Sequence, residues 1–192
     1  MPVPTAEEFR KKFVEVFNEC CKGARHNSFE QAWKNWTAFM TGKKTKVDSW
    51  SKRAVLPSVA KKFGLLPQEE FMRIDLVFYQ KGRCPLAVAV EHENDSRDFK
   101  TELERLFSVR SRLKVGINYA WHGSQEFDDV KRKLKDSIHE YWKYYVNGLL
   151  PEPPQTEYLF LLGNEKTKKS ITWHHISFKA PRGPGRSNFE VS

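Results

Sequence analysis

The sequence predicts an α/β fold in which a mixed central sheet is flanked by helices. Segments with apolar residues at helical spacing alternate with short runs rich in β-branched and aromatic residues, in the order αα, ββ, α, β, α, ββ. Hydrophobic residues make up 39% and aromatic residues 14% of the chain, a proportion that supports a real core. The 192 residues suffice for one ordinary domain, so we expect residues 1–179 to form a single domain.

Two helices are predicted in the N-terminal segment, residues 1–41. The first spans 5–21 and opens with Thr5 and Glu8, which have the spacing of a capping box. The second begins at Ser28. The apolar residues that recur at helical spacing in the two segments are Phe9, Phe13, Val16, Phe17, Phe29, Trp33, Trp36 and Met40.

The densest basic stretch of the chain follows, at residues 43–62. Basic residues stand there against a single acid, Asp48. The stretch fits either a solvated loop with a short helix or a surface that contacts phosphate groups. Its basic residues are Lys43, Lys44, Lys46, Lys52, Arg53, Lys61 and Lys62.

Two short runs, 71–80 and 85–94, predict a β-hairpin, because they are rich in β-branched and aromatic residues and flank a turn that contains Gly82. If the turn is centred near residue 83, the residue numbers of two opposed positions add up to about 166. Asp75 then lies opposite Glu91. Side chains alternate between the two faces of a strand. One face then carries Ile74, Leu76, Phe78, Leu86, Val88 and Val90, and the other carries Asp75, Val77, Tyr79, Ala87, Ala89, Glu91 and Glu93. Both faces are mostly apolar, which is typical of strands in a covered sheet.

The rest of the chain alternates between helical and strand patterns. In order, it predicts a helix over 96–112, a strand over 114–121, a long helix from Ser124 to the PEPP segment at 151–154, and a hairpin of strands over 157–165 and 170–179. His174 and His175 are adjacent on the last strand and point to opposite faces, so they cannot share one metal ion without a bulge. The tail 180–192 is rich in Gly and Pro, and we expect it to be mobile.

The carboxylates of the first hairpin, Asp75, Glu91 and Glu93, are the candidates for a metal-binding or catalytic site. Opposed side chains in an antiparallel pair have Cβ atoms about 4.5–5.5 Å apart, so Asp75 and Glu91 could bind one hard cation. Without a cation, two such acids repel one another and are costly to bury. Glu93 follows on the same face, where it could orient or deprotonate a metal-bound water. His92 points to the other face, where we expect it to pack or to form a hydrogen bond, although its backbone carbonyl could be a metal ligand.

Charge and missing motifs narrow the classes of function. The net charge is +9, with a pI near 9.4, which favours a polyanionic partner. No apolar run is long enough to span a bilayer and the first residues carry charge where a signal peptide is apolar, so we expect a cytoplasmic protein with no membrane partner. The three cysteines form no CxxC pair, and the P-loop, GxGxxG, HExxH and GxSxG motifs are missing.

The run IDLVFY followed by AVAVEHEN resembles the core of the PD-(D/E)XK, or restriction-endonuclease-like, nucleases. In that family a carboxylate on one strand is followed by a carboxylate-x-Lys tripeptide on the next; Asp75 matches the first acid and Glu91 the second. Glu93 stands where the family usually has lysine, although some restriction endonucleases also carry Glu-x-Glu there. Lys100, on the next predicted helix, could supply the missing positive charge. The resemblance implies an αβββαβ core over 50–121, with a strand before Met72.

The resemblance also implies a metal-dependent DNA endonuclease. Asp75 and Glu91 would hold Mg²⁺, with Mn²⁺ as a possible substitute, and Glu93 would help to activate the attacking water. In that family an acidic residue of the first helix often completes such a site, and Glu15 or Glu30 could serve here. The residues expected to contact nucleic acid are Lys43, Lys44, Lys46, Lys100 and Arg105.

Two alternatives stay open. The chain could be a non-catalytic protein of the same fold that binds nucleic acid or a protein partner, an interpretation that Glu93 favours. It could also be an unrelated interaction domain with a charged, solvent-exposed hairpin edge. A nuclease of this class would often act as a homodimer, because both strands must be cut.

Overall fold

The computed structural model of the protein describes residues 3–22, 36–42, 54–82, 86–93, 99–120, 124–146, 155–167 and 170–180. Within these ranges the chain forms one six-stranded mixed sheet with the strand order β1-β2-β3-β4-β5-β6. The neighbours β3–β4 and β4–β5 are parallel, and the other pairs are antiparallel. The strands are β1 (Leu66–Phe71), β2 (Ile74–Tyr79), β3 (Leu86–His92), β4 (Ser111–Ala120), β5 (Glu157–Thr167) and β6 (Ser170–Lys179).

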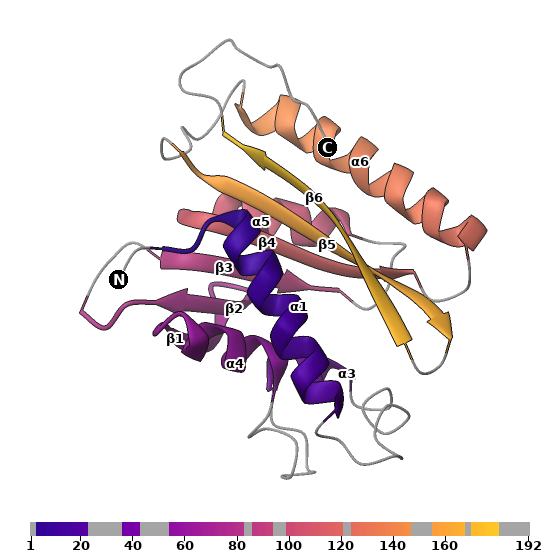
Figure 1. The fold of residues 1–192 in the computed structure, drawn as a ribbon. Coiled ribbons are helices and arrows are strands. Elements are labelled where there is room, and N and C mark those ends of the chain that lie inside the picture. Colours follow the sequence, from indigo (N-terminus) through magenta and orange to yellow (C-terminus); the bar gives the residue numbers. More distant parts are fainter. Residues whose placement is uncertain are drawn as a thin grey trace.

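Helices cover both faces of the sheet, which confirms the predicted α/β class (Figure 1). One face is covered by α1 (Ala6–Lys22), α3 (Trp36–Thr41) and α4 (Val55–Lys62), and the other by α5 (Lys100–Ser108) and α6 (Ser124–Val146). The predicted capping box is present at the start of α1. The Glu8 carboxylate accepts a hydrogen bond of 2.8 Å from the Thr5 backbone N–H, and the Thr5 hydroxyl accepts one of 3.2 Å from the Glu8 N–H.

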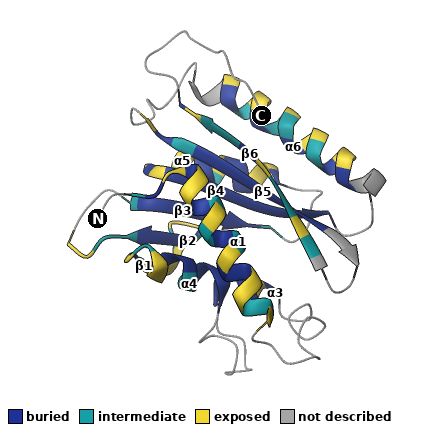
Figure 2. Ribbon diagram, in the orientation of Figure 1, coloured by how far each residue is buried: buried dark blue, intermediate teal, exposed yellow. Residues whose placement is uncertain are grey.

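Two apolar clusters lie on the two sides of the sheet. Buried side chains of α1, α3 and α4 pack on the face that carries Leu76, Phe78, Val88 and Val90. Those of α5 and α6 pack on the face that carries Val77 and Ala89. The central strands β3 and β4 are buried along most of their length, whereas most of β1 is exposed at the sheet edge (Figure 2). Burial on both faces is what the mostly apolar strands β2 and β3 predict.

The predicted register of the first hairpin is confirmed. Leu76 pairs with Val90 and Phe78 with Val88, and the residue numbers of each pair add up to 166. The predicted alternation fails at the start of each strand: Ile74 and Leu86 pack in the α5 and α6 cluster instead, and Ala87 packs in the cluster under α1, α3 and α4. At Ile74 the reason is the β1–β2 turn, in which Met72 and Arg73 both have positive φ, so that the regular pleat starts only after it.

Other predicted elements were correct in kind but not always in extent. The strand expected before Met72 is β1. The helix predicted over 96–112 ends at Ser108, because Val109 is extended and residues from Ser111 onward pair with β3. Sheet hydrogen bonds thus replace a locally helical pattern. The segments 28–35 and 43–53 lie outside the described residues.

The C-terminal hairpin is confirmed, with β5 antiparallel to β6. The rings alternate between its faces as predicted: Trp173 packs 4.8 Å from Phe13 of α1, and His174 lies 4.4 Å from Phe127 of α6, both measured between ring centroids. Ala180 is buried and its N–H donates to the Thr156 carbonyl, so it belongs to the folded part, while 181–192 lies outside the described residues. In the helices described, none is long and apolar enough to cross a membrane.

Candidate functional site

Asp75 and Glu91 come together on neighbouring strands. The pairing of Leu76 with Val90 places the preceding residue of β2, Asp75, opposite Glu91 of β3. Val77, two residues after Asp75, and Ala89, two residues before Glu91, belong to the apolar cluster under α5 and α6. Glu91 therefore points to that face, at the end of the sheet where β3 finishes, and the Asp75 carboxyl lies close enough to act on it.

Asp75 is half-buried and is fixed by the backbone of the neighbouring strand. Its Oδ2 accepts a hydrogen bond of 2.9 Å from the His92 N–H. This contact ties the start of β2 to the end of β3.

Glu91 is the most unusual group of the site, because its side chain is fully buried. None of the donors described contributes a hydrogen bond to either of its oxygens. Burial raises the pKa of Glu91 to about 9, and the neighbouring Asp75 carboxylate adds to this rise. At neutral pH, and without a cation, Glu91 therefore retains its proton.

The residues present fit a hard divalent cation. Mg²⁺ is usually bound by one or two carboxylates, with water and substrate phosphate oxygens completing its shell. Asp75 and Glu91 supply two such carboxylates, and the buried oxygens of Glu91 lack the donors that would otherwise compensate them. In the part of the chain described, no group of three or more His, Cys, Asp or Glu is arranged to hold a metal ion. A cation here would thus take its other ligands from water, backbone or substrate.

His92 is the last residue of β3, and Glu93 follows it. Glu93 is half-buried, and its N–H donates to the Ile117 carbonyl at 2.9 Å, which extends the pairing with β4. His92 lies on the α1 side, where its Nε2 is 2.9 Å from the Tyr119 hydroxyl. The hydrogen bond expected for His92 is therefore confirmed. Burial lowers the pKa of His92 to about 4, so its ring is neutral near pH 7.

Two residues of α5, Glu102 and Arg105, also lie at the site. Glu102 is only 7% exposed, and its Oε1 is 3.6 Å from Nη1 of Arg105. Both act on Glu91: Arg105 lowers the pKa of that carboxyl and Glu102 raises it. From the sequence, Arg105 was predicted only as a phosphate contact, and Glu102 was missed. The available signal was an acid inside an apolar helical stripe, three residues after Phe99.

Several candidates lie elsewhere. The Lys100 ammonium is exposed and lies 3.8 Å from the Glu140 carboxylate of α6, so the structure does not bring it to the carboxylates. Glu15 lies on α1, across the sheet, and pairs with Lys12 at 2.6 Å. It therefore cannot complete the site. The remaining sequence candidates, Glu30, Lys43, Lys44 and Lys46, lie outside the described residues.

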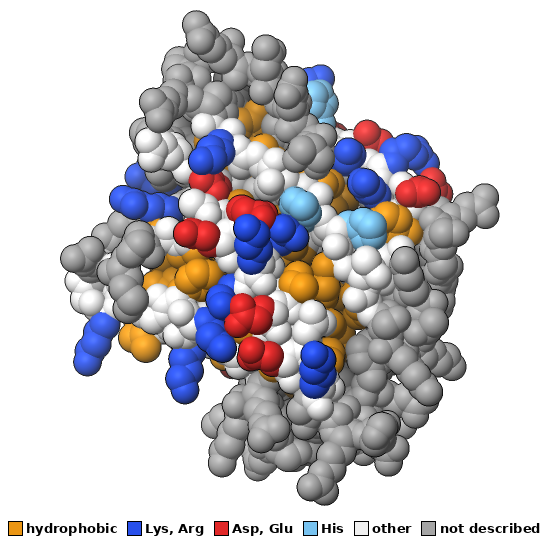
Figure 3. Space-filling model, in the orientation of Figure 1, with side chains coloured by type: hydrophobic (Ala, Val, Ile, Leu, Met, Phe, Trp, Pro, Cys, Tyr) orange, Lys and Arg blue, Asp and Glu red, His pale blue; other side chains and the backbone are white. Residues whose placement is uncertain are grey.

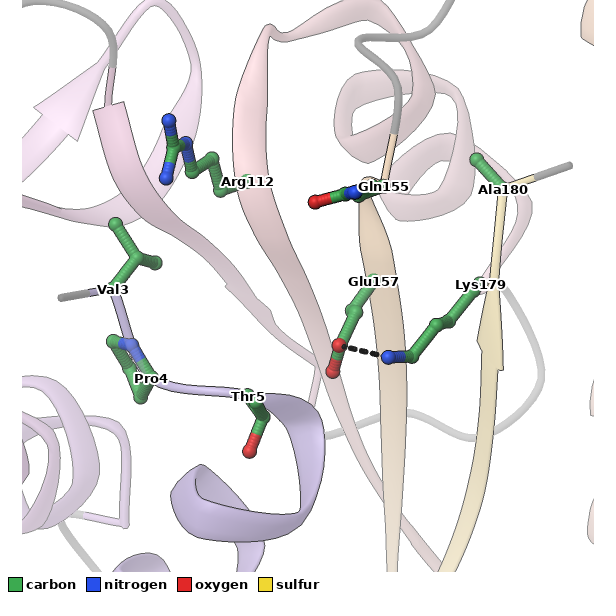
Figure 4. A pocket seen from close by; sticks show the side chains of 8 residues that line it. All are labelled: Val3, Pro4, Thr5, Arg112, Gln155, Glu157, Lys179 and Ala180. Carbon is green, nitrogen blue, oxygen red and sulfur yellow. Dashed lines mark ion pairs between the residues drawn. The ribbon is translucent and has the colours of Figure 1, made fainter. Parts of the chain in front are cut away.

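A hollow of about 480 Å³ lies at the opposite end of the sheet (Figure 4). Arg112 and Glu157 line it from the starts of β4 and β5, and Lys179 from the end of β6. Glu157 is already engaged, since it pairs with Lys179 at 2.8 Å and accepts the Ala6 N–H at 2.6 Å. Because the hollow lies at the other end of the sheet, it is separate from the carboxylate site.

Among the described side chains on the face shown in Figure 3, Lys and Arg are interspersed with Asp and Glu. On α1, Arg10 pairs with Glu7 and Lys12 pairs with Glu15. Comparisons of the chain with family models, curated proteins and solved structures gave no match.

Proposed function

We propose that the protein is a metal-dependent nuclease that hydrolyses phosphodiester bonds of DNA. The observation that carries the proposal is the opposition of Asp75 and Glu91, with Glu91 fully buried and no described donor bonded to its oxygens. The element order supports it: within 50–121, α4 precedes β1-β2-β3, and α5 connects β3 to the parallel strand β4. This order is compatible with the αβββαβ core that the resemblance to the PD-(D/E)XK nucleases implies.

The proposed chemistry assigns a role to each acid of the site. Asp75 and Glu91 would hold Mg²⁺, or Mn²⁺ in its place. When bound, such an ion lowers the pKa of a water and stabilises the charge that develops on the phosphate. Glu93 would accept a proton from the attacking water as its oxygen bonds to phosphorus. The bond from phosphorus to the leaving oxygen then breaks, and that oxygen takes a proton from solvent.

The positive net charge supports a nucleic-acid substrate. Neutralisation of phosphates by Lys and Arg dominates the affinity of such proteins and makes it sensitive to salt. Lys43, Lys44 and Lys46 are the residues that we expect to contribute outside the site. A second candidate function is a non-catalytic nuclease-fold protein that binds DNA, which the presence of Glu93 in place of lysine favours.

Cleavage of supercoiled plasmid with Mg²⁺ or Mn²⁺ tests the proposal. The unmodified protein should nick the plasmid. Asp75→Asn and Glu91→Gln should abolish nicking while the circular dichroism spectrum is retained, and Glu93→Gln should slow it. Asp128→Asn, an exposed acid on α6, is the matched control and should cleave normally.

Two further results decide between the candidates. Replacing Lys43, Lys44 and Lys46 together should weaken DNA binding and reduce its salt dependence. The unmodified protein could bind DNA but cut neither single-stranded nor duplex substrates with either metal. That result would refute the proposed nuclease activity and favour the non-catalytic function.

A further inference from the structure

We propose that Arg105, held in position by Glu102, is the cation of the carboxylate site that contacts the scissile phosphate. It would serve in place of the lysine that Glu93 replaces. The inference rests on the proposed nuclease function and adds to it a substrate-contacting residue and a positioning residue, both from α5.

The packing of α5 brings the start of this helix close to Glu91. Gly116 of β4 is the register partner of Glu91. Phe99, which immediately precedes α5, lies so close to Gly116 that a Cβ built there would be 2.7 Å from its Cζ. A side chain on residue 116 would hold α5 away from the sheet. The glycine therefore lets the start of the helix approach the strand position next to Glu91, and Glu102 follows Phe99 by about one helical turn.

The two residues divide the roles of anchor and contact. The Glu102 side chain is 9% exposed and that of Arg105 is 36% exposed, so a buried acid holds a guanidinium that still reaches solvent. A guanidinium has five N–H donors, and Glu102 can accept only some of them. The rest can bind two phosphate oxygens at once, a geometry that a guanidinium matches well.

Arg105 is also near enough to Glu91 for its charge to act on that carboxyl. Among the groups that do so, it is the one that favours the ionised carboxylate. Lys100, the other cation of α5 that the sequence offered, lies toward Glu140 of α6. Arg105 is therefore the better placed of the two to stabilise negative charge that develops on a phosphate between Asp75 and Glu91.

The test compares Arg105→Ala, Arg105→Lys and Glu102→Gln with Arg112→Ala, an exposed arginine at the far end of the sheet. The first readout is the single-turnover rate of plasmid cleavage. Arg105→Ala should lose about 10²- to 10³-fold, the usual effect of removing one donor to a developing anion. Arg105→Lys should recover part of the rate, and the control should keep it.

Chemical rescue and a double variant of Glu102 and Arg105 give a second readout. Millimolar guanidinium should restore part of the rate of Arg105→Ala and none of the rate of Asp75→Asn. Glu102→Gln should slow cleavage less than Arg105→Ala, and it should add nothing once Arg105 is already Ala, because it acts only through that side chain.

Mn²⁺ binding without DNA provides a readout that is independent of cleavage. Arg105→Ala should bind Mn²⁺ as tightly as the unmodified protein or several-fold more tightly, since it removes a positive charge beside Glu91. Asp75→Asn should bind Mn²⁺ more weakly.

Two results would overturn the inference, and they are distinguishable from each other. If the unmodified protein cleaves and Asp75→Asn does not, but Arg105→Ala cleaves at the normal rate or loses Mn²⁺ binding, then Arg105 is a structural residue and the nuclease function stands. If the unmodified protein does not cleave at all, the proposed function and this inference fail together.

Discussion

Replacing Glu91 with Gln should change the pH dependence of stability in the metal-free protein. The folded carboxyl keeps its proton up to a pKa of about 9, against 4.5 for the ordinary group. Its contribution to stability is therefore complete below pH 4.5 and is lost as the pH rises toward 9. The slope is about 1.4 kcal/mol per pH unit, so the loss at pH 7 is about 3 kcal/mol. The amide introduced by Glu91→Gln has no such proton to lose and escapes this cost.

Urea unfolding in the presence of a chelator, followed by tryptophan fluorescence, measures the effect. The comparison between the two proteins is needed because His92 acts in the opposite direction. Its pKa is lowered to about 4, so its contribution to stability rises with pH between about 4 and 6.5 and masks Glu91 there. The difference in unfolding free energy in favour of Glu91→Gln should widen steadily from pH 5 to pH 8. Parallel curves for the two proteins would show that Glu91 is ionised in the folded state, and the reasoning would be wrong.

Substitutions at three other positions test the packing around the site and in the core. Gly116→Ala should destabilise the protein by about 1–3 kcal/mol in urea unfolding, because its Cβ would lie 2.6–2.7 Å from carbons of two phenylalanine rings. Tyr119→Phe should cost about 1–3 kcal/mol, measured as a lower melting temperature, since it removes the hydroxyl that binds the buried His92 ring. Lys114 is fully buried, with Nζ 3.3 Å from the Tyr158 hydroxyl. Lys114→Met should therefore stay within about 1.5 kcal/mol or be stabilising, whereas Lys114→Ala should cost about 2–5 kcal/mol; equal losses would refute this.

Local patterns in the chain were sufficient to predict the facing carboxylates. The alternation of residues along β2 and β3, together with a short turn, specifies which positions oppose each other, so Asp75 and Glu91 could be paired from the sequence alone. The side of His92 followed from the same alternation. The α1 capping box was predictable because both of its residues lie within one helical turn.

Long-range packing decided the rest of the site. Helical spacing shows which residues of α5 share a face, but not where that face will lie on the sheet. The close approach of Phe99 to Gly116 sets this position and brings Glu102 and Arg105 to Glu91. Glu15 was a reasonable candidate from sequence, yet α1 packs on the opposite face. Strand alternation and turns act over a few residues and can be read directly, whereas the placement of a helix on a sheet depends on contacts between segments far apart in the chain.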